Sequence, residues 1–365
     1  MKRAALVIAA LALAVTITGA VLGAVAARGL ARPVDPEGAA RLFVVEPGEP
    51  LGRVAARLGQ DGLVHPNGLS GPRSLVLWAR LQGVDRTVKS GEYELSPAQS
   101  PLGILRAIIL GQVKTWPVTL PDGLTIEEVA ERLAAAGIAE RDALVELARD
   151  REFVRRQGIE AESLEGYLFP ETYQFRRGTD PDAVLARMLQ EFHAAWQPED
   201  RANLAASGLS LHQLVTLASI VEKETGAAHE RPRIAAVFHN RLERGMRLQS
   251  DPTVIYGVLR SRGEFDGNLR RRDLEADTPY NTYTRAGLPP GPISSASMAS
   301  IRAILTPEDV PYLYFVSRND GTHHFSTTLR EHVNAVNRYQ KRRRSRGDAL
   351  GDESGAPRAA RSSGR

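Results

Sequence analysis

The pattern of hydrophobic and polar positions divides the chain into stretches of different character. From Ala4 to Ala27 the chain carries no charge, and 24 helical residues measure about 36 Å, enough to cross a hydrocarbon core of roughly 30 Å. Short amphipathic segments then alternate with Pro- and Gly-containing turns to about Glu140, and helical periodicity continues to Gly245. The remainder is rich in Pro, Gly, Asn and Thr, which predicts long ordered loops. The pattern predicts an α+β protein with one N-terminal transmembrane helix.

The apolar N-terminal run predicts where the rest of the chain lies. Lys2 and Arg3 precede the run, and basic residues favour the cytoplasmic side of a membrane. We therefore expect residues 1–28 to form a cytoplasmic N-terminus and a single-pass anchor in the cytoplasmic (inner) membrane, with the rest of the chain outside the cytoplasm. The alternative is a signal peptide cleaved near the small residues of GAVAA. Residues 29–40 are expected to form a short linker rich in Pro and Gly.

A short similarity recurs inside the chain at a separation of 75 residues. The segment from Val45 reads VEPGEPLGRVAARL, and the segment from Leu120 reads LPDGLTIEEVAERL. Each predicts an extended segment, a Pro-x-Gly turn and an amphipathic helix. The pattern at residues 41–115 is typical of a small LysM-like subdomain, which packs two helices on a short sheet and often contacts glycan. The alternative is convergent strand–turn–helix patterning.

Two segments further on are predicted from their aromatic residues and turns. Residues 163–175 read SLEGYLFPETYQF, and Pro170 prevents a regular helix there. Aromatic residues alternate along this segment, which favours an extended conformation with one packed face. Later, YLYFVS and HHFSTT flank Asn319-Asp320-Gly321 and predict a β-hairpin.

A carboxylate interrupts an otherwise apolar helix face. Ser210 is a suitable N-cap for a helix over residues 210–226. Its apolar stripe passes through Leu217, Ile220 and Val221, and the next position on that stripe is Glu224. Burial disfavours the charged form of a carboxyl group, so its pKa rises and it can hold a proton near neutral pH, as a general acid requires.

The neighbouring acid and basic residues bear on that interpretation. Glu222 lies two positions before Glu224, so we expect it to project to the other side of the helix as an exposed carboxylate. The alternative for Glu224 is that it reaches solvent at the helix end or pairs with Arg231 or Arg233.

Composition and missing motifs exclude several classes of function. Residues 341–365 carry eight basic and three acidic side chains, leaving 39 basic and 40 acidic residues elsewhere. A neutral body with a basic tail, expected to be disordered, argues against nucleic acid as a partner. The chain has no cysteine and no GxxxxGK[ST], GxGxxG, GxSxG or HExxH motif. His323 and His324 would point to opposite faces of a strand, so we interpret them as hairpin residues and expect neither metal nor cofactor.

Several long blocks resemble one known family. They are EGYLFPETY, LASIVEKET, RPRIAAVFHNRLERGMRLQSDPTVIYG, PYNTYTRAGLPPGPISSAS and PYLYFVSRNDGTHHFSTTLREH. In this order they resemble the endolytic murein transglycosylases, also called YceG-like proteins, over nearly all of the chain after the apolar run. The resemblance implies a membrane anchor, a LysM-like subdomain and a larger mixed α+β catalytic domain, which we expect at residues 116–340.

The resemblance also implies a reaction. Such enzymes cleave peptidoglycan glycan strands between N-acetylmuramic acid and N-acetylglucosamine, and leave 1,6-anhydromuramic acid ends without using water. One carboxylate suffices, because the C6 hydroxyl of the substrate attacks the anomeric carbon. The family places the acid in the segment that reads IVEKE in this chain, and the helical stripe selects Glu224. Penicillin-binding proteins and other wall-synthesis proteins are the implied partners.

Further residues of the matching blocks are candidates for substrate contact, each equally compatible with a structural role. Glu165 and Glu171 flank the aromatic segment and could orient sugar hydroxyls, and Glu171 is a second candidate acid. The loop residues offer hydrogen-bonding and stacking groups suited to a glycan groove, and they are Gln249, Asp251, Tyr280, Asn281, Thr282 and Tyr283. The competing functions are a non-catalytic peptidoglycan-binding scaffold and a hydrolytic, lysozyme-like muramidase.

Overall fold

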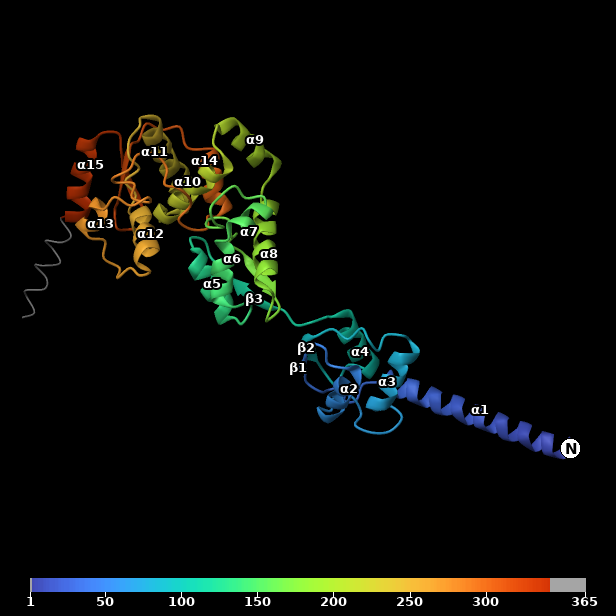
Figure 1. Cartoon of the computed structure of the whole chain (residues 1–365). Helices are drawn as coiled ribbons and strands as arrows, with labels where there is room; N and C mark the ends of the chain where they lie inside the picture. The colour runs from blue at the N-terminus through green and yellow to red at the C-terminus, as the bar shows by residue number, and fades with distance from the viewer. Residues whose placement is uncertain (1, 342–365) are drawn as a thin grey trace, which may run out of the picture. The chain divides into compact units, whose positions relative to one another are not determined.

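The computed structural model describes residues 2–341, which separate into two compact units (Figure 1). Unit 1 extends to Pro117 and includes Gln174–Thr179, and unit 2 comprises Val118–Tyr173 and the chain from Asp180. Helices predominate, with three two-stranded sheets among the described residues. The structure therefore confirms that the chain combines helices with strands and has an apolar N-terminal helix. Residues 342–365 of the predicted basic tail lie outside the described residues.

Unit 1 packs three short helices against a two-stranded antiparallel sheet. Strand β1 (Arg41–Val45) pairs with β2 (Gly91–Leu95), placing Phe43 opposite Tyr93. The helices are α2 (Leu51–Gln60), α3 (Pro72–Leu81) and α4 (Pro101–Leu110). Alternate strand residues and one face of each helix fill the core, whose members include Phe43, Leu58, Leu75, Tyr93, Ile104, Leu105 and Ile108.

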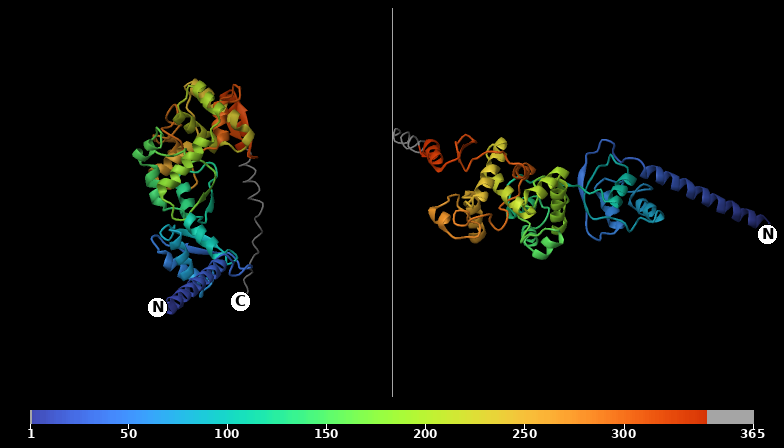
Figure 2. Two further views of the ribbon diagram at one scale, coloured as in Figure 1. Left: turned by 90° about the vertical axis from the view of Figure 1, so that its right-hand side faces the viewer. Right: turned by 90° about the horizontal axis from the view of Figure 1, so that it is seen from above.

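Helix α1 (Lys2–Leu30) continues into the core of unit 1. Figure 2 shows α1 as one unbroken helix, and Leu6–Leu30 is long and apolar enough to cross a membrane. Leu30 is only 2% exposed and belongs to the unit 1 core. The backbone of Gly29 lies so close to Ser70 that an added Cβ would be 2.7 Å from the Ser70 Cβ. The apolar helix is therefore joined to unit 1 by packing.

The segment after α1 differs from the predicted linker because it is fastened to unit 1. The amides of Val34 and Asp35 donate to the Pro97 carbonyl at 3.0 and 3.1 Å. The Ser96 hydroxyl donates to the Gly38 carbonyl at 2.6 Å. Helix α1 also includes Gly29 and Leu30, the first two residues of the predicted linker, and Pro and Gly composition does not tell whether such a segment forms hydrogen bonds with the rest of the chain.

Unit 2 is mainly helical, with β3 at its beginning and η2 at the end of the described residues. In chain order the elements are β3 (Trp116–Thr119), α5 (Ile126–Ala135), α6 (Arg141–Ala148), α7 (Arg151–Arg156), β4 (Thr172–Phe175), α8 (Pro181–Ala194), α9 (Pro198–Ser207), α10 (Leu211–Glu224), η1 (Ala228–Glu230), α11 (Arg231–Glu243), α12 (Asp251–Arg262), α13 (Arg271–Glu275), α14 (Met298–Leu305), β5 (Tyr314–Ser317), β6 (His323–Ser326), α15 (Leu329–Val336) and η2 (Asn337–Lys341). Strands β3 and β4 pair, as do β5 and β6.

Helix α10 is the central helix of unit 2. Ser210 caps it as predicted, accepting from the Gln213 amide, and the Gln213 side chain accepts from the Ser210 amide in return. Residues 214–221 are all buried, and α11, α12 and α14 pack around the helix (Figure 1). A helix buried on every side brings both of its terminal acids into the interior of the unit.

Of the other predicted elements, the hairpin and the two Pro-x-Gly turns form, whereas one predicted loop contains a helix. The β5–β6 hairpin forms with Asn319 at positive φ, and Gly48 and Gly123 occupy matching left-handed turns before α2 and α5. The prediction of a loop at LQSDPTVIYG was wrong, because α12 begins at Asp251. Pro252 lies in the first turn of that helix, where its missing amide hydrogen costs nothing.

Gly166 gives a test of this packing. Its φ is +84°, and an added Cβ would lie 2.4 Å from the Pro292 Cβ and 2.9 Å from a Val215 methyl group. Gly166→Ala should lower the free energy of unfolding by about 2–5 kcal/mol, through left-handed backbone strain and overpacking together. Gly158→Ala is the matched control, because Gly158 has a φ of +76° and nothing within 4 Å of the added Cβ. Urea unfolding measures both, and equal losses would contradict the packing argument.

Candidate active site

A cavity of about 510 Å³ in unit 2 lies at the C-terminal end of α10. Its wall is formed by α10, α11, the loop before α12, the loop that carries Tyr283, the β5–β6 hairpin and α15. Glu224 is the only carboxylate that α10 contributes to it. The lining residues are Glu224, Arg241, Leu248, Gln249, Asp251, Tyr283, Tyr314, Phe315, Val316, Ser317, His323, Leu329, His332, Val336 and Gln340.

Glu224 is held in this cavity by a short hydrogen bond. The Ser250 hydroxyl donates to Glu224 Oε1 at 2.6 Å, and Ser250 is 1% exposed. The predicted alternatives of pairing with Arg231 or Arg233 are wrong, because Arg231 pairs with Glu222 and Arg233 pairs with Glu308. Glu224 therefore forms an ion pair with neither arginine.

The surroundings of Glu224 favour its protonated form. Burial raises the pKa of Glu224 to about 7, the Ser250 hydrogen bond opposes this rise, the nearby negative charge of Asp251 adds to it, and the positive charge of Arg241 opposes it. The partial negative charge at the C-terminus of α10 acts in the same direction as burial. A carboxyl group with a pKa near 7 can both donate and accept a proton at neutral pH.

The loop that supplies Ser250 is held in a strained conformation. Gln249 has a φ of 51°, which is uncommon for a residue other than glycine. Its amide donates to the Thr282 carbonyl at 3.2 Å, and the Ser250 amide donates to the Thr282 hydroxyl at 3.0 Å. The Thr253 hydroxyl donates to the Ser250 carbonyl at 2.7 Å. These bonds fix the backbone so that the Ser250 side chain turns toward Glu224 instead of capping α12.

Glu222 corrects one sequence prediction. It was expected to be exposed, but its side chain is only 6% exposed. It accepts from the Ser297 amide and hydroxyl at 2.9 and 2.6 Å and pairs with Arg231 at 3.0 Å. Burial would raise the pKa of Glu222, but these hydrogen bonds outweigh it and hold the pKa below its ordinary value. Glu222 ties α10 to the N-cap of α14, so its role is structural.

Glu165 is a second buried carboxyl group, and the cavity distinguishes it from Glu224. It is 3% exposed, accepts from the Ile126 amide at 3.2 Å and from the Tyr256 hydroxyl at 2.9 Å. Burial raises the pKa of Glu165 to about 8. A perturbed pKa alone would therefore select Glu165, but this group joins α5 to α12 and does not line the cavity that holds Glu224.

The remaining predicted substrate residues fall into two groups. Gln249, Asp251 and Tyr283 line the cavity, and the Tyr283 hydroxyl donates to Asp251 at 2.6 Å. The others do not line it: Asn281 and Thr282 are buried and hold the surrounding loops, Tyr280 packs against Tyr256, and Glu171 is exposed and accepts from the Thr172 amide.

Sequence reasoning missed Arg241, a cation in the cavity wall. Its guanidinium donates to the carbonyls of Leu313 at 2.6 Å and Leu248 at 2.7 Å. It forms no ion pair with a carboxylate among the described residues, and burial holds its pKa below its ordinary value. Its position inside the block HNRLERGM was the available signal, but nothing in that pattern shows that α11 faces the cavity.

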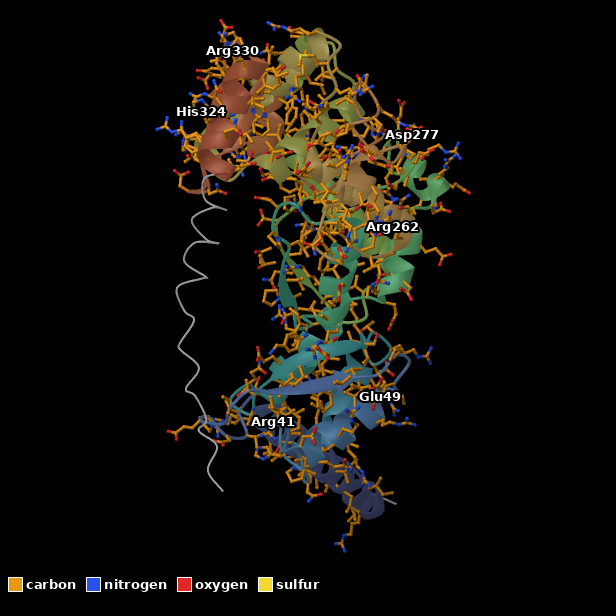
Figure 3. The ribbon with its side chains drawn as sticks, turned by 90° about the vertical axis from the view of Figure 1, so that its left-hand side faces the viewer. Arg41, Glu49, Arg262, Asp277, His324 and Arg330 are labelled. Carbon is orange, nitrogen blue, oxygen red and sulfur yellow. The ribbon has the colours of Figure 1, made fainter. Side chains whose placement is uncertain are left out.

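The interpretation of both histidines of the pair as simple hairpin residues was incomplete. His323 lines the cavity, and its Nδ1 lies 2.8 Å from the buried carboxylate of Glu230. Because the Glu230 carboxylate accepts this hydrogen bond, Nδ1 is the donor. His324 lies at the outer edge of unit 2 beside the Tyr339 ring (Figure 3). Within residues 2–341, no three His, Asp or Glu side chains gather as a metal ion would require.

Comparison with known proteins gives consistent matches. A family model described as YceG-like matches residues 43–338. A Bacillus subtilis protein named endolytic murein transglycosylase is 31% identical over 270 residues, which are 69% of this chain and 73% of that protein. A Streptococcus pneumoniae protein of the same name is 27% identical over 277 residues, and the chain spans about half of its length, 49%.

A solved structure supports the same relationship. The crystal structure of a YceG-like protein from Listeria monocytogenes aligns with 82% of this chain and all of that chain. The TM-score is 0.55, and the sequences are 31% identical.

The two acids of α10 should affect stability with opposite dependence on pH. The pKa of folded Glu224 is raised to about 7, so its stabilising contribution is complete below about 4.5 and is lost as the pH rises through 7. The pKa of folded Glu222 is lowered, so its contribution is present above about 4.5 and is lost as the pH falls through the lowered pKa.

Urea unfolding of the wild type, Glu224→Gln and Glu222→Gln across this pH range measures both effects. The wild type should lose stability relative to Glu224→Gln as the pH rises from about 5 to 8. The free energy of unfolding of the wild type should lose its excess over that of Glu222→Gln as the pH falls below about 4.5. Differences that run in the same direction would contradict these assignments.

Proposed function

The chain belongs to the YceG-like family, and we propose that it is a membrane-anchored endolytic murein transglycosylase. Its substrate is the glycan strand of peptidoglycan, cut between N-acetylmuramic acid and N-acetylglucosamine. Its relatives carry that activity in their names. One observation supports the assignment of Glu224 as the acid: its pKa is raised to about 7, and it lies in the wall of an open cavity.

Glu224 acts first as an acid and then as a base. Its proton passes to the glycosidic oxygen, and the bond from the muramic acid C1 to that oxygen breaks. The C6 hydroxyl oxygen of the same sugar bonds to C1, and the hydroxyl proton returns to the Glu224 carboxylate. The products are a 1,6-anhydromuramic acid end and an N-acetylglucosamine end, and no water is consumed.

The surroundings of Glu224 suit both steps. After the proton is donated, the new carboxylate accepts from the Ser250 hydroxyl and lies in the field of Arg241, which favours the charged form. The same contacts must not be too strong, because a carboxylate with an ordinary pKa would hold too few protons near pH 7. Burial opposes them and keeps the two forms close in free energy.

Sugar hydroxyls are held by the polar groups around the acid. Gln249 and Asp251 are exposed in the cavity wall, and Tyr283 is half-buried beside Asp251. They offer an amide, a carboxylate and an aromatic ring, the groups that orient and stack on sugars. Asn281, Thr282 and Glu165 act indirectly, by fixing the loops and helices that carry the cavity.

This reaction takes place at the outer surface of the membrane, which the apolar helix α1 supports. Helix α1 is the anchor, with Lys2 and Arg3 on the cytoplasmic side and units 1 and 2 outside the cytoplasm. Residues 41–115 form the LysM-like subdomain and contact glycan, which their packing of short helices on a two-stranded sheet supports. Penicillin-binding proteins and other wall-synthesis proteins are the partners, because an anchored enzyme meets strands close to where they are made.

Replacement of Glu224 by Gln tests the acid. The amide keeps the shape of the side chain but cannot donate a proton to the glycosidic oxygen. Because general acid–base catalysis contributes about 10²–10⁴-fold, the yield of 1,6-anhydromuropeptides from purified glycan strands should fall by that factor. Mass spectrometry of the products measures it. Glu171→Gln is the matched control, since Glu171 is an exposed acid outside the cavity.

The products distinguish the competing functions. Reducing muramic acid ends from the wild type would identify a hydrolase instead of a transglycosylase. Full activity of a folded Glu224→Gln variant would remove Glu224 from the mechanism. Binding of sacculi without any cleavage by the wild type would favour the non-catalytic scaffold.

Replacement of Ser250 by Ala tests the hydrogen bond to Glu224. That bond favours the carboxylate, so its loss should raise the pKa of Glu224 further above 7. The rate falls as the pH rises through this pKa, because the acid must be protonated, and in the variant the fall should occur roughly one pH unit higher. Ser250→Thr keeps the hydroxyl and should retain the wild-type profile. An unshifted profile in Ser250→Ala would show that the hydroxyl does not tune the acid.

A further inference from the structure

Helix α3 carries leucine side chains on the face that it turns away from the unit 1 core. Leu75 and Ala79 are fully buried in that core, whereas Leu77 is 58% exposed and Leu81 is 75% exposed. Leu77 and Leu81 are four residues apart and therefore lie on the same side of the helix. Two neighbouring exposed leucines form an apolar patch of the kind that contacts a partner or a membrane.

Basic residues accompany these leucines. Arg73 and Arg80 are exposed on the same helix. Arg80 has only a distant partner in Asp85, at 4.0 Å, and its side chain is 69% exposed. We call Arg73, Leu77, Arg80 and Leu81 the α3 outer face. Leucine with arginine on one exposed helix face is typical of a helix lying in the headgroup region of a membrane.

Within unit 1, helix α3 lies next to the end of the apolar helix α1. The segment that leads into α3 contacts the end of α1, where an added Cβ on Gly29 would lie 2.7 Å from the Ser70 Cβ. Leu30 lies in the same core as Leu75, and residues after it are fastened to Pro97. In Figure 1, α3 lies beside the end of α1, whereas β1 and β2 lie on the other side of unit 1. The end of the apolar span is therefore connected to α3 by packing within unit 1 and not only through a flexible segment.

We propose that the α3 outer face lies in the lipid headgroup region of the membrane that α1 spans. Leu77 and Leu81 enter the boundary of the acyl chains, and Arg73 and Arg80 contact anionic headgroups. Unit 1 then has two attachments to the membrane, the span and this face, which together fix its orientation. The inference rests on the anchor proposed above and is independent of the role of Glu224.

The absence of cysteine from the chain allows a direct test. Single variants Leu81→Cys and Leu77→Cys of the full chain are labelled with an environment-sensitive nitrobenzoxadiazole dye and reconstituted in nanodiscs containing phosphatidylglycerol. Leu42→Cys is the matched control, because Leu42 is 45% exposed on β1. Val15→Cys, within the span, reports insertion of α1.

The proposal predicts a distinct pattern of quenching. Dye at positions 77 and 81 should emit at shorter wavelength, be quenched by lipids with a nitroxide near the headgroup, and be shielded from aqueous iodide. Dye at position 42 should respond only to iodide. The blue shift at position 81 should diminish in nanodiscs of phosphatidylcholine alone and in the Arg73→Gln, Arg80→Gln background, because anionic headgroups then no longer hold the face.

Other results would overturn the proposal in recognisable ways. If positions 81 and 42 behave alike while position 15 is quenched by deep nitroxides, the span is inserted and the face is not at the membrane. Shielding of position 81 from iodide without nitroxide quenching would mean that protein or glycan covers the face instead of lipid. No deep quenching at position 15 would remove both the anchor and the inference, without bearing on Glu224.

Discussion

Desolvation of the carboxyl groups at the end of α10 is the constraint on which the site depends. Because residues 214–221 are buried all round the helix, the two acids that follow cannot both reach solvent. Each must find partners or give up its charge. Glu222 finds Arg231 and Ser297 and stays charged, with its pKa lowered. Glu224 has one hydroxyl donor and a cavity, and its pKa rises to about 7.

The same constraint explains the construction of the surrounding loops. A single hydroxyl must be aimed at Glu224 without a full positive charge at contact distance, because an ion pair would lower the pKa too far for an acid. Ser250 provides that hydroxyl, at the cost of a left-handed backbone at Gln249. Thr282 and Thr253 hold the strained segment through hydrogen bonds at 3.0 and 2.7 Å. Arg241 supplies positive charge from the cavity wall, while its own donors are held by backbone carbonyls.

In unit 1 the important constraint is the connection between the apolar span and the folded domain. A flexible linker would let the domain turn freely. In this chain the last residue of α1 is a core residue, and the following segment is fixed by backbone hydrogen bonds. Such a connection limits how unit 1 can meet the lipid surface. The α3 outer face would stabilise that limited orientation, because exposed leucine side chains gain free energy when they leave water for the membrane interface.

The sequence by itself determined those features that depend on local spacing. Helical periodicity placed Glu224 on the stripe of Leu217 and Ile220, and Ser210 marked the start of the helix. The turn at residues 319–321 identified the hairpin. Spacing describes one element at a time, however, and it gives no information on what packs against the opposite face. Glu222 was therefore predicted to be exposed, although α11 and α14 cover it.

Only the tertiary structure decided which distant residues share the cavity. Arg241, Gln249 and His323 come from three segments that no periodicity connects, and their meeting depends on how α11, α12 and the hairpin pack around α10. The same packing separates Glu224 from Glu165, since burial raises the pKa of both but only one lines the cavity. A pKa depends on the field of all surrounding groups, and that field exists only once the chain has folded.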